Sequence, residues 1–170
     1  MDQFEDKSIK VGSVGEMVVA CAKSAIQQSQ SIDFLAVFGH GKGGYQSVGA
    51  GKTLESSGMR SLRIKLVYRE GESLLMGPAE KYLSGLNGVL SLDATILLAG
   101  CNVGEGDQGS GLLTTVSQIL ANRRVQAFEN AVYWWTGYLV GPLKEARGSV
   151  VSSSLSVYQV HRSTLLPNFL

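Results

Sequence analysis

Two residues with reactive side chains, a histidine and a cysteine, each follow a short apolar run. His40 comes soon after residues 32–38, in a glycine-rich stretch, and Cys101 comes soon after residues 94–99. Continuous apolar runs of this length are typical of strands buried on both faces of a parallel sheet. Because parallel strands end at one edge of a sheet, we expect the two side chains to meet there, although they are 61 positions apart. The chemistry that such a pair performs is nucleophilic attack by a thiolate.

The residue types give each member of the pair a role. Cys101 is the candidate nucleophile, because the glycine before it permits a tight turn that points the sulfur into a cleft. His40 is the candidate general acid and base, which protonates a leaving amine and then activates water. The backbone amides of Gly41 and Cys101 are candidates for an oxyanion hole, since Gly41 has no side chain to block a scissile carbonyl.

Apolar periodicity predicts the elements that position these residues. Helices are expected over 14–28, 79–86 and 110–121, and strands over 33–38, 62–68, 94–99, 125–128 and 150–160. The passage 41–51 is expected to form a hairpin and 102–109 a loop, because both are rich in glycine. Strands that alternate with helices favour parallel connections. The predicted fold class is therefore α/β, a three-layer αβα sandwich with a mainly parallel central sheet.

The composition predicts one ordinary globular domain. The 170 residues fit a single domain, 1–170, in which 1–12 form a tail or an edge strand. A hydrophobic content of 44% argues against a disordered chain. The formal net charge of +1 provides no field that would attract nucleic acid or an anionic membrane, so we expect neither as a partner.

The cysteines and the amino end predict a cytoplasmic protein. Two cysteines are too few for a disulfide framework, and Cys21 falls on the apolar face of the first predicted helix, where we expect it in the core. The first residues are charged and lack the apolar segment of a secretion signal. Export without a classical signal peptide, or origin from a longer chain, stays open.

Two stretches resemble a known family. IDFLAVFGHG (32–41) and ATILLAGC (94–101) are similar to the paired signatures of the caspase-like cysteine peptidases, the group that includes caspases, legumain, gingipains and separase. The glycine-rich passage 43–49, and the GEG of 104–106 with the leucine-rich helix after it, resemble small bacterial caspase-like domains most. The resemblance covers about residues 14–130.

This resemblance implies an αβα sandwich and a thiol protease, a hydrolase of peptide bonds that needs no cofactor. By position, His40 matches the family histidine, Cys101 the nucleophile and Gly41 an oxyanion-hole amide. The implied partners are a protein or peptide substrate and an activator protein, since several such enzymes stay inactive until an activator orders their loops. The alternative is a catalytically silent caspase-like fold that acts as a protein-binding module.

Substrate preference and other ligands are less well marked in the sequence. Glu129 is a candidate for receiving a basic substrate side chain, Lys42, Arg60 or Arg63 for an acidic one, and Trp134 for walling a substrate groove. Two histidines and two cysteines without close pairing predict no metal site. The GKT of 51–53 suggests a phosphate loop, but Gln46 stands where that motif needs glycine, so nucleotide binding is not predicted.

Overall fold

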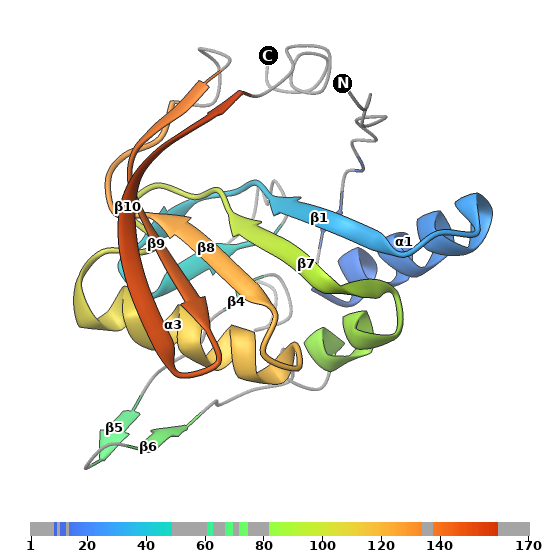
Figure 1. The fold of residues 1–170 in the computed structure, drawn as a ribbon, viewed down its shortest axis with the longest axis horizontal. Coiled ribbons are helices and arrows are strands. Elements are labelled where there is room, and N and C mark those ends of the chain that lie inside the picture. The colour runs from blue at the N-terminus through green and yellow to red at the C-terminus, as the bar shows by residue number, and fades with distance from the viewer. Residues whose placement is uncertain are drawn as a thin grey trace.

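A five-stranded mixed sheet forms the centre of the protein in a computed structural model (Figure 1). The structure describes residues 9, 11–12, 14–48, 61–62, 67–69, 72–74, 82–133 and 138–159. The spatial order of the strands in the sheet is β1 (Ile32–Val37), β7 (Leu90–Leu98), β8 (Arg124–Phe128), β9 (Tyr138–Arg147) and β10 (Val150–Gln159). The first three strands are parallel, whereas β9 and β10 are antiparallel to their neighbours. The predicted α/β class is confirmed, with a sheet that is mixed.

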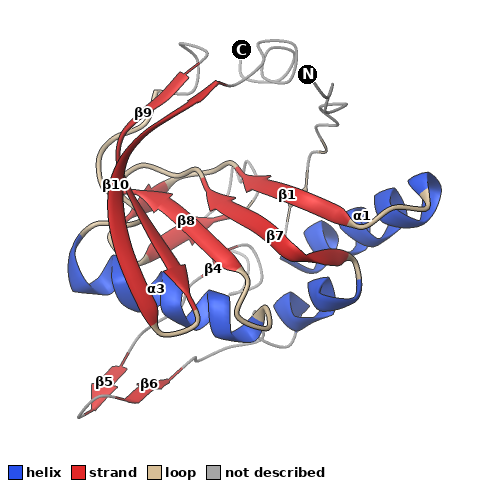
Figure 2. Cartoon of the chain, viewed as in Figure 1, coloured by secondary structure: helices blue, strands red, loops and turns tan. Residues whose placement is uncertain are grey.

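The helices begin where local hydrogen bonding and packing favour them. α1 (Val14–Gln28) has the predicted bounds. The Glu16 carboxylate accepts a hydrogen bond of 2.6 Å from the Gly12 amide, just before the helix. The other described elements of this kind are α3 (Gly106–Ile119) and the short 3-10 helix η1 (Ser84–Gly88) (Figure 2).

Both α1 and α3 pack on the same face of the sheet. Their buried residues join one hydrophobic cluster with alternate strand residues such as Ile96, Leu98 and Val125. Leu97 and Phe128 point to the other face, because side chains alternate along a strand, and they belong to a second cluster with no helix residue. Of the three predicted layers, the described residues supply the sheet and one helical layer, so the third layer stays a prediction.

The second face is partly enclosed by the sheet itself. β1 and β10 are the two edges of the sheet, yet the rings of Phe34 and Tyr158 on these strands lie 5.8 Å apart between centroids. Tyr158 also contacts the ring of Phe128 edge-on, and its hydroxyl donates a hydrogen bond of 2.5 Å to Gln126. The sheet therefore curls strongly, and β10 crosses over the second face (Figure 1).

Two smaller sheets accompany the central one. The predicted hairpin is confirmed over 41–47, where β2 (Gly41–Lys42) pairs with β3 (Tyr45–Ser47), and β4 (Ser61–Leu62) pairs with β3 in turn. β5 (Val67–Arg69) and β6 (Glu72–Leu74) form a separate ribbon. The ends of the strand predicted over 62–68 thus lie in different sheets, and 63–66 fall outside the described residues.

Other element boundaries also differ from the expectation. Of the helix predicted over 79–86, residues 82–83 are helical and continue into η1, which ends at Gly88. β7 starts four residues before the predicted Ala94, and α3 starts four residues before the predicted Ser110. The glycines of 102–109 favoured a loop, but a side chain at Gly109 would overlap the backbone of Gly104. Glycine here permits close packing of the first turn of α3 rather than a flexible loop.

A buried arginine joins the end of α3 to the start of β7. Arg123 is only 4% exposed, and its Nε donates to the Ser91 carbonyl at 2.6 Å. Nη2 donates to the Leu90 carbonyl at 2.9 Å, and Nη1 donates to Asn87 Oδ1 at 2.6 Å and to the Leu120 carbonyl at 3.0 Å. These hydrogen bonds from the Arg123 side chain hold the amino end of β7, the strand that leads to Cys101.

Candidate active site

The two strands that precede the predicted site residues end side by side. β1 and β7 are parallel neighbours in which Val37 is paired with Leu98, and the Ala99 amide donates a hydrogen bond of 2.8 Å to the Val37 carbonyl. His40 lies three residues beyond Val37, and Cys101 lies three residues beyond Leu98. The register therefore brings the two segments to the same level at one edge of the sheet.

Gly41 packs directly on the backbone beside Cys101. A Cβ placed on Gly41 would lie 2.7 Å from the Cys101 carbonyl oxygen and 2.9 Å from the carbonyl carbon of Gly100, and it would overlap a methyl group of Val103. Real Cβ atoms essentially never approach so closely, so this position accepts only glycine without a shift of the backbone. The residue next to His40 is thus packed against the backbone of the candidate nucleophile.

Cys101 is half-buried, and its thiol has a hydrogen-bond acceptor. The Sγ atom lies 3.5 Å from the Val132 carbonyl, to which the thiol donates. The loop that follows lies along the segment after β8, where the Asn102 amide donates to the Asn130 carbonyl at 2.9 Å and the Gly104 amide donates to the Phe128 carbonyl at 2.9 Å. Among the described residues, none accepts a hydrogen bond from the Cys101 amide itself.

His40 and Cys21 occupy contrasting positions. His40 is exposed at the sheet edge, where a substrate can reach it. Cys21 is buried on α1 within the first hydrophobic cluster, as predicted, whereas Cys101 packs against the second cluster on the other side of the sheet. Burial raises the pKa of the Cys21 thiol, which disfavours its reactive thiolate form. The two thiols therefore differ in environment, with Cys101 partly exposed and Cys21 buried.

Glu129 is already paired within the protein. Its carboxylate lies 3.0 Å from the Nζ atom of Lys144, whose side chain is only 9% exposed and which also donates to the Gly106 carbonyl at 3.0 Å. This bridge braces the start of α3 against the end of β8. A substrate cation would have to compete with Lys144 for Glu129, so the role predicted for this carboxylate is weakened by its partner.

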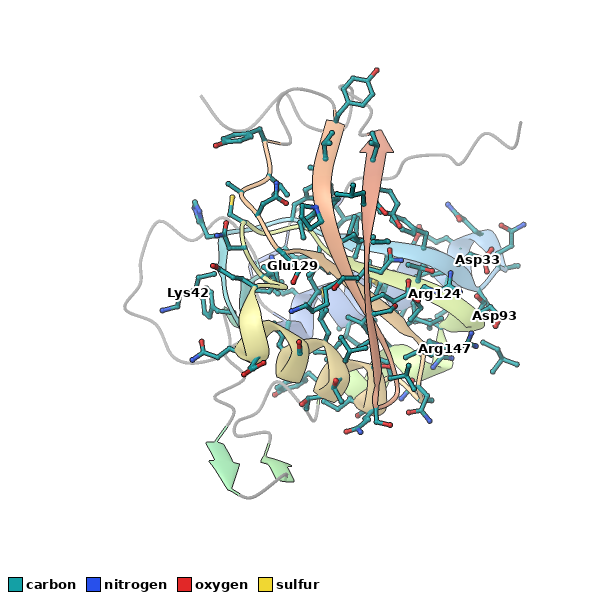
Figure 3. The ribbon with its side chains drawn as sticks, turned by 60° about the vertical axis from the view of Figure 1, so that its left-hand side comes forward. Asp33, Lys42, Asp93, Arg124, Glu129 and Arg147 are labelled. Carbon is teal, nitrogen blue, oxygen red and sulfur yellow. The ribbon has the colours of Figure 1, made fainter. Side chains whose placement is uncertain are left out.

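Of the other residues predicted to set substrate preference, Lys42 lies within the described part of the chain. Figure 3 shows Lys42 and Glu129 toward the end of the sheet opposite Asp93 and Arg147. Lys42 is exposed, with its Nζ atom 5.9 Å from the ring centroid of Tyr45. Trp134, Arg60 and Arg63 lie outside the described residues.

A buried glutamine at this edge is not predicted by the sequence. Gln46 is fully buried, and its Oε1 atom accepts a hydrogen bond of 2.9 Å from the Gly100 amide. In the sequence, Gln46 was noted only as a departure from a phosphate-loop motif. Nothing local distinguishes a buried glutamine from an exposed one in a glycine-rich hairpin, so the sequence held no signal for its role.

The part of the chain that the structure describes shows neither a cluster of metal ligands nor a membrane-spanning helix. No group of three or more histidine, cysteine, aspartate or glutamate side chains in those residues is arranged to hold a metal ion. None of the described helices is long and apolar enough to cross a membrane.

Comparison with known proteins yields one family. The model of a domain of unknown function, DUF4347, matches residues 13–132, which is more than half of the chain. No curated protein and no solved structure matches the chain. The matched region contains both His40 and Cys101, and it ends at Val132, whose carbonyl accepts the hydrogen bond from the Cys101 thiol.

Proposed function

Because the chain belongs to the DUF4347 family, whose function is unknown, we propose its activity from the site: it is a cysteine endopeptidase that hydrolyses peptide bonds through Cys101 and His40. The observation that carries this proposal is the contact of Gly41 with the backbone of Gly100 and Cys101. That contact brings the segment bearing an exposed histidine against the segment bearing an accessible thiol.

The proposed reaction has two steps. The thiol proton of Cys101 passes to His40, and Sγ forms a bond to the scissile carbonyl carbon, whose oxygen takes up the negative charge. His40 then gives the proton to the leaving amine, the C–N bond breaks and a thioester remains. In the second step water loses a proton to His40 and attacks the thioester, which releases a carboxylic acid and regenerates the thiol. The Cys101 amide, with that of Gly41, is assigned to the oxyanion.

The caspase-like three-layer sandwich and a cytoplasmic location belong to this proposal. The fold is supported by the parallel order of β1, β7 and β8 and by the two helices on the first face. The predicted substrate is a protein or peptide, and no cofactor enters the reaction.

The proposal is tested with a mixed peptide library read by mass spectrometry. Wild-type protein and a Cys21→Ala variant are expected to cleave the library, whereas Cys101→Ala is expected to be inactive. Alkylation with iodoacetamide, mapped on the same samples, should modify Cys101 and spare the buried Cys21. Cleavage that persists in Cys101→Ala would exclude the proposed nucleophile, and a Cys101 less reactive than Cys21 would exclude the proposed site.

One observation favours a second candidate, the protein-binding module. Tyr138, Val140, Leu155 and Val157 share one face of the β9–β10 hairpin by their pairing, and Leu155 is 85% exposed. Exposed apolar side chains that cluster in this way mark interaction surfaces. For a pure binding module, Cys101→Ala would leave every measurable activity of the protein unchanged, whereas for the peptidase it would not.

A further inference from the structure

The residue that joins the two halves of the candidate site is Gln46. It is 0% exposed, although glutamine is rarely buried without hydrogen-bond partners. Its backbone pairs with Gly41 on β2 and with Leu62 on β4. Its side chain reaches the end of β7, where Oε1 accepts the hydrogen bond from the Gly100 amide.

These contacts place Gln46 between the residue after His40 and the residue before Cys101. A Cβ on Gly100 would lie 2.7 Å from Gln46 Oε1 and 3.0 Å from the Cα atom of Gly41, so three segments meet there with no space for a further atom. Gln46 holds Gly41 through its main chain and Gly100 through its side chain. The side chain of Val103 also lies against both glycines, but through a methyl group that makes no hydrogen bond.

The hydrogen bond also determines which amides are free for a substrate. The Gly100 amide is committed to Gln46, while no described residue accepts a hydrogen bond from the neighbouring Cys101 amide. The bond to Gln46 restrains the Ala99–Gly100 peptide, to which the Gly100 amide belongs. The next peptide, Gly100–Cys101, is restrained by Gly41, since a Cβ placed there would lie 2.9 Å from the Gly100 carbonyl carbon. Together the two contacts restrict rotation about Gly100, and with it the orientation of the peptide that carries the Cys101 N–H.

We propose that Gln46 is a positioning residue, which fixes the Ala99–Gly100 peptide and so limits the rotation about Gly100 that would turn the Cys101 amide away from the substrate carbonyl oxygen. The inference rests on the proposed peptidase function and deepens it. Gln46 does not touch the substrate, and it acts through the backbone of the nucleophile. A glutamine that only filled space would be replaceable by an apolar side chain of similar length without any selective effect on oxyanion binding.

Three variants separate these roles. Gln46→Met retains the length of the side chain but removes the oxygen that accepts the hydrogen bond. Gln46→Glu keeps an acceptor oxygen at the same place. Gln118→Met is the matched control, because Gln118 is exposed on α3. Each protein is treated with iodoacetamide, whose attack by the thiolate creates no oxyanion, and with a peptide aldehyde that carries the sequence cleaved in the library. The thiol adds across the aldehyde carbonyl, so an S–C bond forms and the new oxygen needs the Cys101 amide. Exchange of the Gly100 amide proton is followed by NMR.

The expected result is selective. In Gln46→Met, iodoacetamide alkylation of Cys101 stays within about threefold of wild type. Aldehyde affinity falls about 10- to 100-fold, near the lower end of what one oxyanion donor supplies. The Gly100 amide exchanges faster in this variant. Gln46→Glu recovers most of the aldehyde affinity, and Gln118→Met behaves as wild type.

Different failures have different meanings. Unchanged aldehyde binding in Gln46→Met, or a Gly100 amide that stays protected there, overturns the inference alone. Equal losses with both reagents and no recovery in Gln46→Glu also overturn it, because they indicate a purely structural glutamine. A wild-type protein that is alkylated at Cys101 but cleaves nothing in the library refutes the peptidase, and the positioning role with it.

Discussion

Replacing Gly41 by alanine tests the contact on which the proposed function depends. The added Cβ would lie 2.7 Å from the Cys101 carbonyl oxygen and 2.9 Å from the Gly100 carbonyl carbon, where ordinary contacts begin at 3.4 Å. The side chain of Val103 can adjust, but the backbone of Gly100 and Cys101 must move by several tenths of an ångström or more. Overpacking of this kind costs about 1–3 kcal/mol.

The chain offers a matched control for this substitution. A Cβ on Gly88, at the end of η1, would meet nothing within 4 Å. Both substitutions lower the conformational entropy of the unfolded chain to a similar degree, which by itself stabilises the protein by about 0.4–1 kcal/mol. The difference between Gly41→Ala and Gly88→Ala therefore isolates the steric cost at the site.

Calorimetry and kinetics give the two readouts. For a domain of this size, a loss of about 1–3 kcal/mol lowers the Tm by about 2–12 °C, whereas Gly88→Ala should keep or slightly raise it. Because the shift separates His40 from Cys101, peptide cleavage in Gly41→Ala should fall by about 100-fold. Equal Tm values for the two variants would show that Gly41 is not pressed against Cys101, and the argument for the site would fail.

Two further predictions concern groups that stabilise the fold. Arg123→Met removes the side-chain donors from the Leu90, Ser91 and Leu120 carbonyls, of which Leu120 keeps its bond from the residue 123 amide, and should lower the free energy of unfolding by about 3–5 kcal/mol in urea titrations. Arg124→Met, which removes an exposed ion pair with Glu145, should cost no more than about 1 kcal/mol, and a similar cost for both would contradict the role of Arg123. Burial, followed by the charge of Glu145, raises the pKa of Tyr158 above its ordinary value of 10.0. As the pH rises, Tyr158 ionises in the unfolded chain before it ionises in the folded protein. The contribution of protonated Tyr158 to the free energy of unfolding is therefore complete below pH 10 and is lost as the pH rises through the folded pKa. Wild-type protein should lose stability between about pH 9 and pH 11 more steeply than Tyr158→Phe, and parallel curves would refute the assignment.

Several features of the protein follow from local sequence patterns. The apolar spacing that defines α1 and the continuous apolar runs of β1, β7 and β8 depend on residues close in sequence, and each of these elements is present. The placement of His40 and Cys101 at one edge also follows from sequence, because parallel neighbours must end on the same side. Their chemical roles stay predictions.

Other features depend on partners far away in the chain. Gln46 is 54 residues from Gly100, and Lys144 is 38 residues from Gly106, so no local pattern reveals either bond. The early start of α3 depends in the same way on Gly109 fitting against the Cys101 loop.

The sequence by itself determined the parallel strands, the first helix and the edge at which two reactive side chains gather, since periodicity records which side of each element is buried. Only the tertiary structure decided how that edge is built. Curling of the sheet brings Tyr158 over to Phe34. Close packing of glycines sets Gly41 against Cys101, and a partly buried ion pair engages Glu129. Each of these depends on the shape of the folded chain, in which van der Waals contact and desolvation act between residues that the sequence keeps apart.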